Sequence, residues 1–317
     1  MSQELNTTTV PQPTRSQAEF HWLQDFLNSI HSYAPAESMI LESSSAEKLY
    51  HYTDLGGFKG IVEGGDLWLT HLRFSNDHEE FTHGKQIVRR VLGQRIEDDP
   101  PEMTGYLTRL KELVDQPVAD GVYICCFCER NNLLSQWRGY GANGSGVCIE
   151  FDKNRFSHLT GADCHGGLLR LWKVFYPVEQ QRNIIEKAIE FAWCHNGDCD
   201  EEKARRAAEA IQFFIPTFKN PDFAEEQEWR LIFTPHPDLP VKPAFRTGRN
   251  MLIPYYGIRS LGWGDNPLPI TGLCVGPGTQ KDINAQSIQM LIDGRNYDNR
   301  PGYPNVRVEI SKTPYRG

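Results

Sequence analysis

The chain has 317 residues, of which 39% are hydrophobic, 23% are charged and 11% are aromatic, a composition typical of a folded globular protein. Its formal net charge of −8 excludes a protein that coats nucleic acid non-specifically, because such binding depends on an excess of lysine and arginine. No extended nucleic-acid-binding surface is therefore expected. No run of about 18 apolar residues occurs, so we expect no membrane-spanning helix.

The N-terminal region is expected to be an appendage to the main fold. Residues 1–15 lack the basic and then apolar pattern of a signal peptide and are predicted to be a flexible leader. The eight cysteines are therefore expected to be reduced thiols in the cytoplasm. Apolar side chains recur on one face of a predicted helix at 16–32, and a serine-rich joint at 42–45 follows it. These two elements make up a first unit, residues 16–45.

Residues 46–317 are predicted to form one α+β domain. A strand around His51 leads into a glycine-broken helix and a short strand at 67–70. Asn76 or Asp77 caps the next helix, and another helix follows at 103–115. From residue 122 strands dominate, with a mostly helical insert at 178–218 and a helix at 281–292. The further strands are expected at 122–127, 147–151, 168–176, 229–234, 251–256, 271–275 and 306–311. Strands and helices do not alternate steadily, so the sheet is predicted to be mixed.

His51 interrupts a run of good strand formers, and three roles suit it: a core histidine, a metal ligand, or a polar group facing a ligand. The candidate metal ligands elsewhere are Cys164-His165, Cys194-His195 and Cys199. The segment CCFC at 125–128 lies in a predicted strand, where its cysteines alternate between the two faces instead of forming a chelating turn. The other spacings match no zinc pattern, so no metal site is predicted. The glycine-rich segment GANGSG leads into a strand without a following Lys-Ser or Lys-Thr, which favours a turn over a phosphate loop.

Three carboxylates, Glu225, Glu226 and Glu228, stand at the start of the predicted strand at 229–234. If the extended backbone begins early, alternation places Glu226 and Glu228 on the same side of the strand. Two such carboxylates repel each other unless solvent or a ligand offsets the repulsion. The simpler interpretation, which the residues alone favour, is a solvated strand end at which Arg230 pairs locally.

The segment LLSQWRGYGANGSG combines Ser135, Trp137, Arg138 and Tyr140. An aromatic face beside an arginine suits a planar heterocycle that is attached to phosphate. The alternative is that the aromatic side chains close the end of a sheet, and Trp137 is expected to do so because tryptophan is usually buried. Tyr140, which lies between two glycines, is the better candidate for facing a pocket. Asn76, besides capping a helix, could fasten a loop over a ligand.

Taken together, the motifs resemble a known family over residues 48–316. They are LYHYTDLGGFKGIVEGGDLWLTHLRFSNDHEEF, YICCFCERNNLLSQWRGYGANGSGVCIEF, LWKVFYP, FKNPDFAEEQEWRLIF and VEISKTPYR. As a set they resemble the bacterial family called domain of unknown function 2971, which carries no established activity. A more distant resemblance is to the ADP-ribosyltransferases, whose His-Tyr-Glu branch places a histidine on the first strand, an aromatic residue in the middle and a glutamate on a later strand.

The second resemblance implies a split sheet and a site that uses NAD as its substrate. By position, His51 matches the histidine, Tyr140 the aromatic residue (with Trp137 as the alternative) and Glu228 the glutamate. His51 would donate a hydrogen bond to a ribose hydroxyl, and Tyr140 would stack on nicotinamide. Glu228 would stabilise positive charge on the ribose as the nicotinamide bond breaks, while Glu226 would orient a nucleophile. The other residues that the resemblance assigns to binding are Tyr52, Thr53, Asn76, Ser135 and Arg138.

Three functions are therefore carried forward from the sequence. The first is an NAD-consuming enzyme that acts as a toxin or a phage-defence effector and modifies an unidentified protein or nucleic acid, or hydrolyses NAD. The second is a non-enzymatic nucleotide-binding sensor or interaction module. The third is a metal-dependent nuclease or hydrolase that uses His51, Asp77, Glu226 and Glu228.

Overall fold

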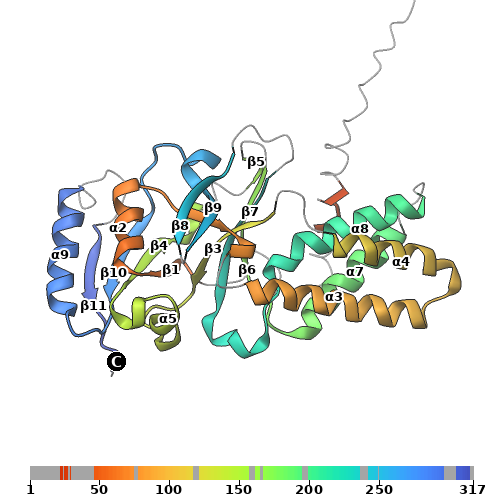
Figure 1. The fold of residues 1–317 in the computed structure, drawn as a ribbon, viewed down its shortest axis with the longest axis horizontal. Helices are drawn as coiled ribbons and strands as arrows, with labels where there is room; N and C mark the ends of the chain where they lie inside the picture. Colours follow the sequence, from red (N-terminus) through yellow and green to blue (C-terminus); the bar gives the residue numbers. More distant parts are fainter. Residues whose placement is uncertain are drawn as a thin grey trace, which may run out of the picture.

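The computed structural model describes residues 22–23, 25–27, 29, 46–74, 78–116, 121–156, 161–164, 167–194, 199–235, 242–248, 250–295 and 305–314. Within these residues the strands form one sheet of 11, whose main path runs β11-β10-β4-β1-β3-β2-β9-β8. β10 and β11 are parallel, whereas the other paired strands are antiparallel. The predicted α+β class with a mixed sheet is confirmed (Figure 1).

The strands have the following bounds: β1 (Lys48–Thr53), β2 (Trp68–His71), β3 (Tyr123–Cys128), β4 (Val147–Asp152), β5 (Gly161–Cys164), β6 (Gly167–Lys173), β7 (Glu228–Pro235), β8 (Ala244–Gly248), β9 (Met251–Gly257), β10 (Ile270–Val275) and β11 (Arg307–Ile310). The α-helices are α2 (Leu55–Gly64), α3 (His78–Asp98), α4 (Pro101–Asp115), α5 (Leu134–Gly139), α6 (Lys153–Phe156), α7 (Val178–Trp193), α8 (Asp200–Phe214) and α9 (Lys281–Gly294). Short 3₁₀ helices are η1 (Leu72–Phe74), η2 (Ala142–Gly144), η4 (Ile215–Thr217), η5 (Pro221–Glu226) and η6 (Ile258–Leu261).

The sheet forks at β3. β7 pairs with the whole length of β3, from Tyr123 to Cys128. β1 and β2 must therefore share the other edge of β3. β1 pairs with β3 at the Cys128 end, and β2 pairs with it at the Tyr123–Ile124 end. We call this divergence of β1 and β2 along one edge of β3 the fork.

Two large hydrophobic cores support the sheet, beside two smaller clusters. The first lies between the sheet and helices α2 and α9, where Phe58 and Ile288 are buried. The second joins helices α3, α4, α7 and α8 with Trp22 and Phe26 of the N-terminal segment. Figure 1 shows these four helices together at one end of the molecule, away from α2 and α9. None of the helices in the described ranges combines the length and the apolar character needed to span a membrane.

Local sequence explains most element boundaries, with a few differences from prediction. The expected glycine-broken helix is continuous: Asp54 accepts a hydrogen bond from Gly57 N, and left-handed Gly65 ends α2. The strand predicted at 168–176 ends at Lys173, because Phe175 N–H donates to the carbonyl of Thr217, outside the sheet. β5, β8 and α6 were not predicted. Of the predicted helix at 16–32, the described residues are helical, and the rest lies outside the described residues.

Candidate functional site

A cavity of about 610 Å³ lies at the fork, and its walls come from β1, β2 and the part of β3 between them. β8, β9, α5 and the segment around β7's first residue complete it. Six residues proposed from the sequence line this one cavity: His51, Tyr52, Thr53, Tyr140, Glu226 and Glu228. The fold therefore brings together residues that are as far apart as 177 positions in the chain.

His51 fills the gap that the fork leaves on β3. Its Nδ1 lies 2.8 Å from the carbonyl oxygen of Cys126, which sits between the two points where β1 and β2 pair with β3. Burial lowers the pKa of His51, and the hydrogen bond to Cys126 opposes that effect only in part. The imidazole is thus neutral at pH 7, and because a carbonyl can only accept, Nδ1 carries the proton. In this tautomer Nε2 accepts a hydrogen bond, whereas the sequence hypothesis made His51 a donor.

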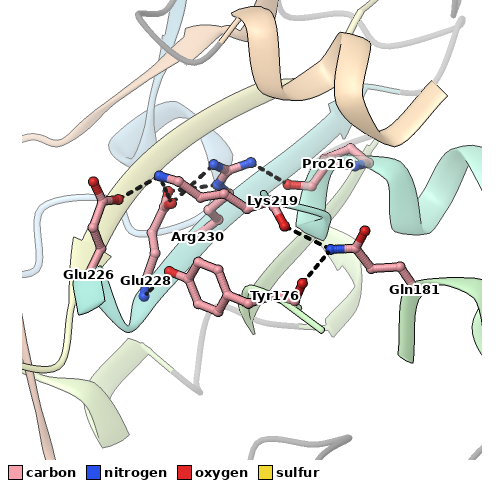
Figure 2. Close-up of polar contacts among 7 residues, drawn as sticks. All are labelled: Tyr176, Gln181, Pro216, Lys219, Glu226, Glu228 and Arg230. Atoms are coloured by element: carbon pink, nitrogen blue, oxygen red, sulfur yellow. Dashed lines mark hydrogen bonds and ion pairs between the residues drawn. The ribbon is translucent and has the colours of Figure 1, made fainter. Parts of the chain in front are cut away.

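A buried cluster of four charged side chains stands beside the cavity (Figure 2). Lys219 Nζ lies 2.5 Å from Glu226 Oε2 and 2.8 Å from Glu228 Oε2. Arg230 binds both oxygens of Glu228, with Nε 2.7 Å from Oε1 and Nη2 3.1 Å from Oε2. Arg230 Nη1 also donates to the carbonyl oxygen of Pro216. The two cations offset the repulsion between the carboxylates and the cost of burying them.

The backbone at Gln227 explains how both carboxylates reach one ammonium group. Glu226 ends the 3₁₀ helix η5, Gln227 is left-handed with a φ of 44°, and Glu228 begins β7. The alternation argument required an extended backbone from residue 226, and this condition is not met, because Glu226 belongs to η5 and the strand begins at Glu228. The convergence of the two side chains on Lys219 comes from the turn at Gln227. The predicted solvated strand end is wrong, since Glu226 and Glu228 are buried, although Arg230 does pair locally with Glu228.

Glu228 is ionised over the whole physiological pH range. Burial by itself would raise the pKa of its carboxyl group, but the charges of Arg230 and Lys219 and their hydrogen bonds lower it from the ordinary 4.5 to about 2. Tyr176 also contacts this residue, because its hydroxyl oxygen accepts a hydrogen bond from Glu228 N at 2.9 Å. The position and the charge of Glu228 are therefore fixed by its neighbours.

Three of the residues predicted around the short helix α5 do not line the cavity: Ser135, Trp137 and Arg138. Trp137 is fully buried, packs edge-on against Tyr52 at 4.8 Å and donates from Nε1 to Asn132 Oδ1. It closes the end of the sheet, as its alternative interpretation held. Arg138 is exposed on the surface of α5.

The remaining predicted binding residues have mixed outcomes. Tyr52 contributes to the cavity wall, but its hydroxyl accepts from Leu133 N and donates to the carbonyl of Arg130. Its aromatic ring, rather than its hydroxyl, is what a ligand could contact. Asn76 and Asp77 lie outside the described residues.

Several cavity residues were missed by the sequence analysis. They are Trp68 and Thr70 of β2, Arg73 of η1, Gln136 of α5 and Arg246 of β8. The alternation in Asp66–Thr70 does place Trp68 and Thr70 on one side of a strand, which was the available signal. No strand was predicted near residue 246, so nothing in the sequence indicated that Arg246 would face a cavity.

Metal binding finds no support in the described part of the chain. No group of three or more histidine, cysteine, aspartate and glutamate side chains there could hold a metal ion. Lys219 Nζ occupies the position between Glu226 and Glu228 that a cation would need. Cys194 and Cys199 are exposed, while His165 and His195 lie outside the described residues.

Comparison with known proteins supports the first resemblance. Residues 136–231 match the family model described as "Protein of unknown function (DUF2971)". The predicted resemblance to this family is confirmed over those residues. The matched segment contains Gln136, Tyr140 and all four members of the charged cluster, whereas His51 lies before it.

Two further comparisons add little. No curated protein matches the chain. Among solved structures, "Thermus sp. 2.9 DarT in complex with NAD+" aligns with 84% of this chain and 96% of its own, at 12% sequence identity and a TM-score of 0.28. With so low a TM-score, this match carries no weight beside the geometry of the cavity.

Proposed function

We propose that the protein is an NAD-consuming enzyme, similar to ADP-ribosyltransferases, that cleaves the bond between nicotinamide and ribose in the cavity at the fork. One observation carries the proposal: His51, Tyr140, Glu226 and Glu228 line a single cavity at the fork of a split sheet. These are the residue types, in the order along the chain, that the resemblance to the His-Tyr-Glu branch assigns to this chemistry.

The residues present suit the individual parts of the reaction. The neutral His51 accepts a hydrogen bond from a ribose hydroxyl at Nε2, and Tyr140 stacks on the nicotinamide ring. As the bond breaks, its electron pair leaves with nicotinamide and neutralises the pyridinium. Glu228, which is ionised at neutral pH, stabilises the positive charge that develops on the ribose. Water or an acceptor group then adds to the anomeric carbon and loses a proton, and Glu226 orients that nucleophile.

The test measures nicotinamide release from NAD by the purified protein, with and without cell extract as a source of acceptors. Glu228→Gln and Glu226→Gln are each expected to lower the rate about 10²–10³-fold, the usual effect of removing one electrostatic stabiliser. Glu225→Gln is the matched control, because Glu225 is an exposed neighbour that does not line the cavity. If the wild type releases no more nicotinamide than a folded Glu228→Gln variant, the protein does not cleave NAD.

A second candidate, binding of a nucleotide without turnover, is favoured by the charged cluster itself. Both oxygens of Glu228 contact cationic groups, which weakens the field that this carboxylate exerts on a bound ribose. A nucleotide sensor would retain NAD binding in the wild type and show no nicotinamide release. The same assay, combined with a binding measurement, separates the two functions.

A further inference from the structure

Arg246 of β8 lines the cavity and joins two of its strands. From β8 it reaches Thr70 of β2, with Nη2 3.3 Å from Oγ1. Its Nε is buried and has no hydrogen-bond partner in the structure. Buried donors are nearly always satisfied, because an unmade hydrogen bond costs free energy. Nε is shielded from the cavity, but Arg246 and Arg73 of η1 both line it, so a bound molecule can contact both residues.

The carboxylates in the cavity wall are already engaged elsewhere. Asp54 accepts the hydrogen bond from Gly57 N that caps α2. Glu226 and Glu228 contact Lys219, and Glu228 also contacts Arg230. In the described residues no carboxylate forms an ion pair with Arg73 or Arg246. This wall of the cavity is therefore positively charged, and it suits an anion.

An aromatic surface stands on the same wall. Trp68 lines the cavity although 43% of its surface is exposed. One side of its ring packs on Tyr255, with ring centroids 4.4 Å apart and 30° between the planes. The exposed part of the indole is available for stacking on a planar heterocycle. An aromatic face beside arginine is the combination that the sequence had suggested near Arg138, with Tyr140 as the preferred aromatic residue.

The register of β3 separates this wall from the carboxylates. Cys128 pairs with Glu228 on one edge and with Tyr50 on the other. Ile124, four residues away, pairs with Thr70, the contact of Arg246. Four residues of strand span about 13 Å. The cavity therefore has a carboxylate end and an arginine end rather than one mixed centre.

We propose that the arginine end binds a nucleoside diphosphate: Arg246 and Arg73 hold the two phosphates, and Trp68 stacks on the base. Guanidinium groups bind phosphate oxygens through paired, charge-assisted hydrogen bonds. The inference rests on the proposed function. In it, the nucleoside diphosphate is the adenosine diphosphate half of NAD, and the nicotinamide ribose of the same molecule lies at His51 and Glu228. Arg246 and Arg73 then determine the requirement for a diphosphate.

The experiment compares ADP and adenosine as probes, in calorimetric titrations of the full-length protein. The wild type is expected to bind ADP more tightly than adenosine. Arg246→Met is expected to weaken ADP binding about tenfold to a hundredfold, the range for losing a charge-assisted hydrogen bond, and to leave adenosine binding unchanged. Arg73→Met, a substitution of an exposed residue, is expected to weaken ADP binding in the same direction and guards against misfolding of the first variant.

Arg138→Met is the matched control, because Arg138 is exposed outside the cavity. The inference is overturned if the wild type prefers adenosine or binds neither probe, if both cavity variants bind ADP like the wild type, or if Arg138→Met shows the larger loss. Arginine-dependent ADP binding without nicotinamide release would contradict the proposed function and leave this inference standing. Nicotinamide release with an unchanged KM for NAD in both cavity variants would support the proposed function and contradict this inference.

Discussion

At the scale of single residues, Lys219 connects the two candidate carboxylates. It is 1% exposed, and its ammonium group contacts both Glu226 and Glu228. Without it, two buried negative charges would face each other, which is a costly arrangement. Arg230 supports Glu228 in the same way. The charge state of the carboxylate end therefore depends on this pair of buried cations rather than on solvent.

The free energy of unfolding should reveal these contacts through its pH dependence. The pKa of Glu228 is lowered to about 2 from an ordinary 4.5, so its ionised form stabilises the folded state above about pH 4.5. That stabilisation is lost as the pH falls toward 2. Glu228→Gln should cost about 3–5 kcal/mol at pH 7, and its difference from the wild type should shrink between pH 4.5 and pH 2.

Urea unfolding at a series of pH values measures this difference. Glu225→Gln serves as the control, because an exposed carboxylate of the same segment should change stability little at any of these pH values. A Glu228→Gln difference that stays constant down to pH 2 would show that the ion pairs do not hold Glu228 in its charged form.

At the scale of elements, the glycine-rich turn between α5 and β4 closes the end of the fork. Gly146 lies against the backbone at the end of β1: a Cβ atom there would stand 2.2 Å from the carbonyl oxygen of Thr53. Ala142, Asn143 and Gly144 are all left-handed, which makes the turn tight. The segment predicted to be a turn rather than a phosphate loop therefore has a packing role beside the cavity.

Substitution of this glycine should be far more damaging than a substitution in an exposed helix. Gly146→Ala is expected to lower the free energy of unfolding by about 3 kcal/mol, because the backbone of Thr53 cannot yield without separating β1 from β4. Gly60→Ala, in the exposed part of α2 with nothing within 4 Å of the new methyl group, should instead add about 0.5–1 kcal/mol. Equal effects in denaturant unfolding would contradict the close approach at Gly146.

At the scale of the whole molecule, the helical core and the sheet meet beside the charged cluster. Gln181 of α7 is fully buried, and its Nε2 donates to the carbonyl oxygens of Phe175 and Lys219, at 2.5 and 2.8 Å. The carbonyl oxygen of Tyr176 lies farther from it, at 3.3 Å; Figure 2 shows the contacts of Gln181 with Tyr176 and Lys219. One helix thus holds the backbone of the residue whose ammonium group contacts both carboxylates. The helical unit therefore helps to position the carboxylate end of the cavity.

Removing this amide should weaken the junction. Gln181→Leu is expected to lower the free energy of unfolding by about 2–4 kcal/mol, because buried carbonyl groups lose their donor. Hydrogen exchange should also become faster in the segment around Lys219. Gln212→Leu is the matched control, since Gln212 makes one hydrogen bond, to the carbonyl of Leu113, and should cost about 1 kcal/mol or less. Similar losses in the two variants would argue against a special role for Gln181.

Local features of the fold could be predicted from the sequence, because they depend on neighbours in the chain. Apolar runs located β3 and β7. Alternation over 66–70 could also have placed Trp68 and Thr70 on one side of a strand, but neither was chosen as a site residue. His51, Tyr140, Glu226 and Glu228 were chosen by residue type and by resemblance, and they do line one cavity. Arg138, which the resemblance assigned to binding, does not line the cavity, whereas Trp137 is buried, as expected from its residue type, because the six-residue helix α5 turns one inward and the other outward.

By itself, then, the sequence determined the class of the fold, most of its elements and the residue types that line the carboxylate end of the cavity. Only the tertiary structure decided that Lys219 neutralises Glu226 and Glu228, and that Arg246 and Trp68 form the other end of the cavity. The physical reason is that these contacts join separate strands of a forked sheet. Arg246 lies 176 residues from Thr70, and no local pattern records which side chains such a fork brings together.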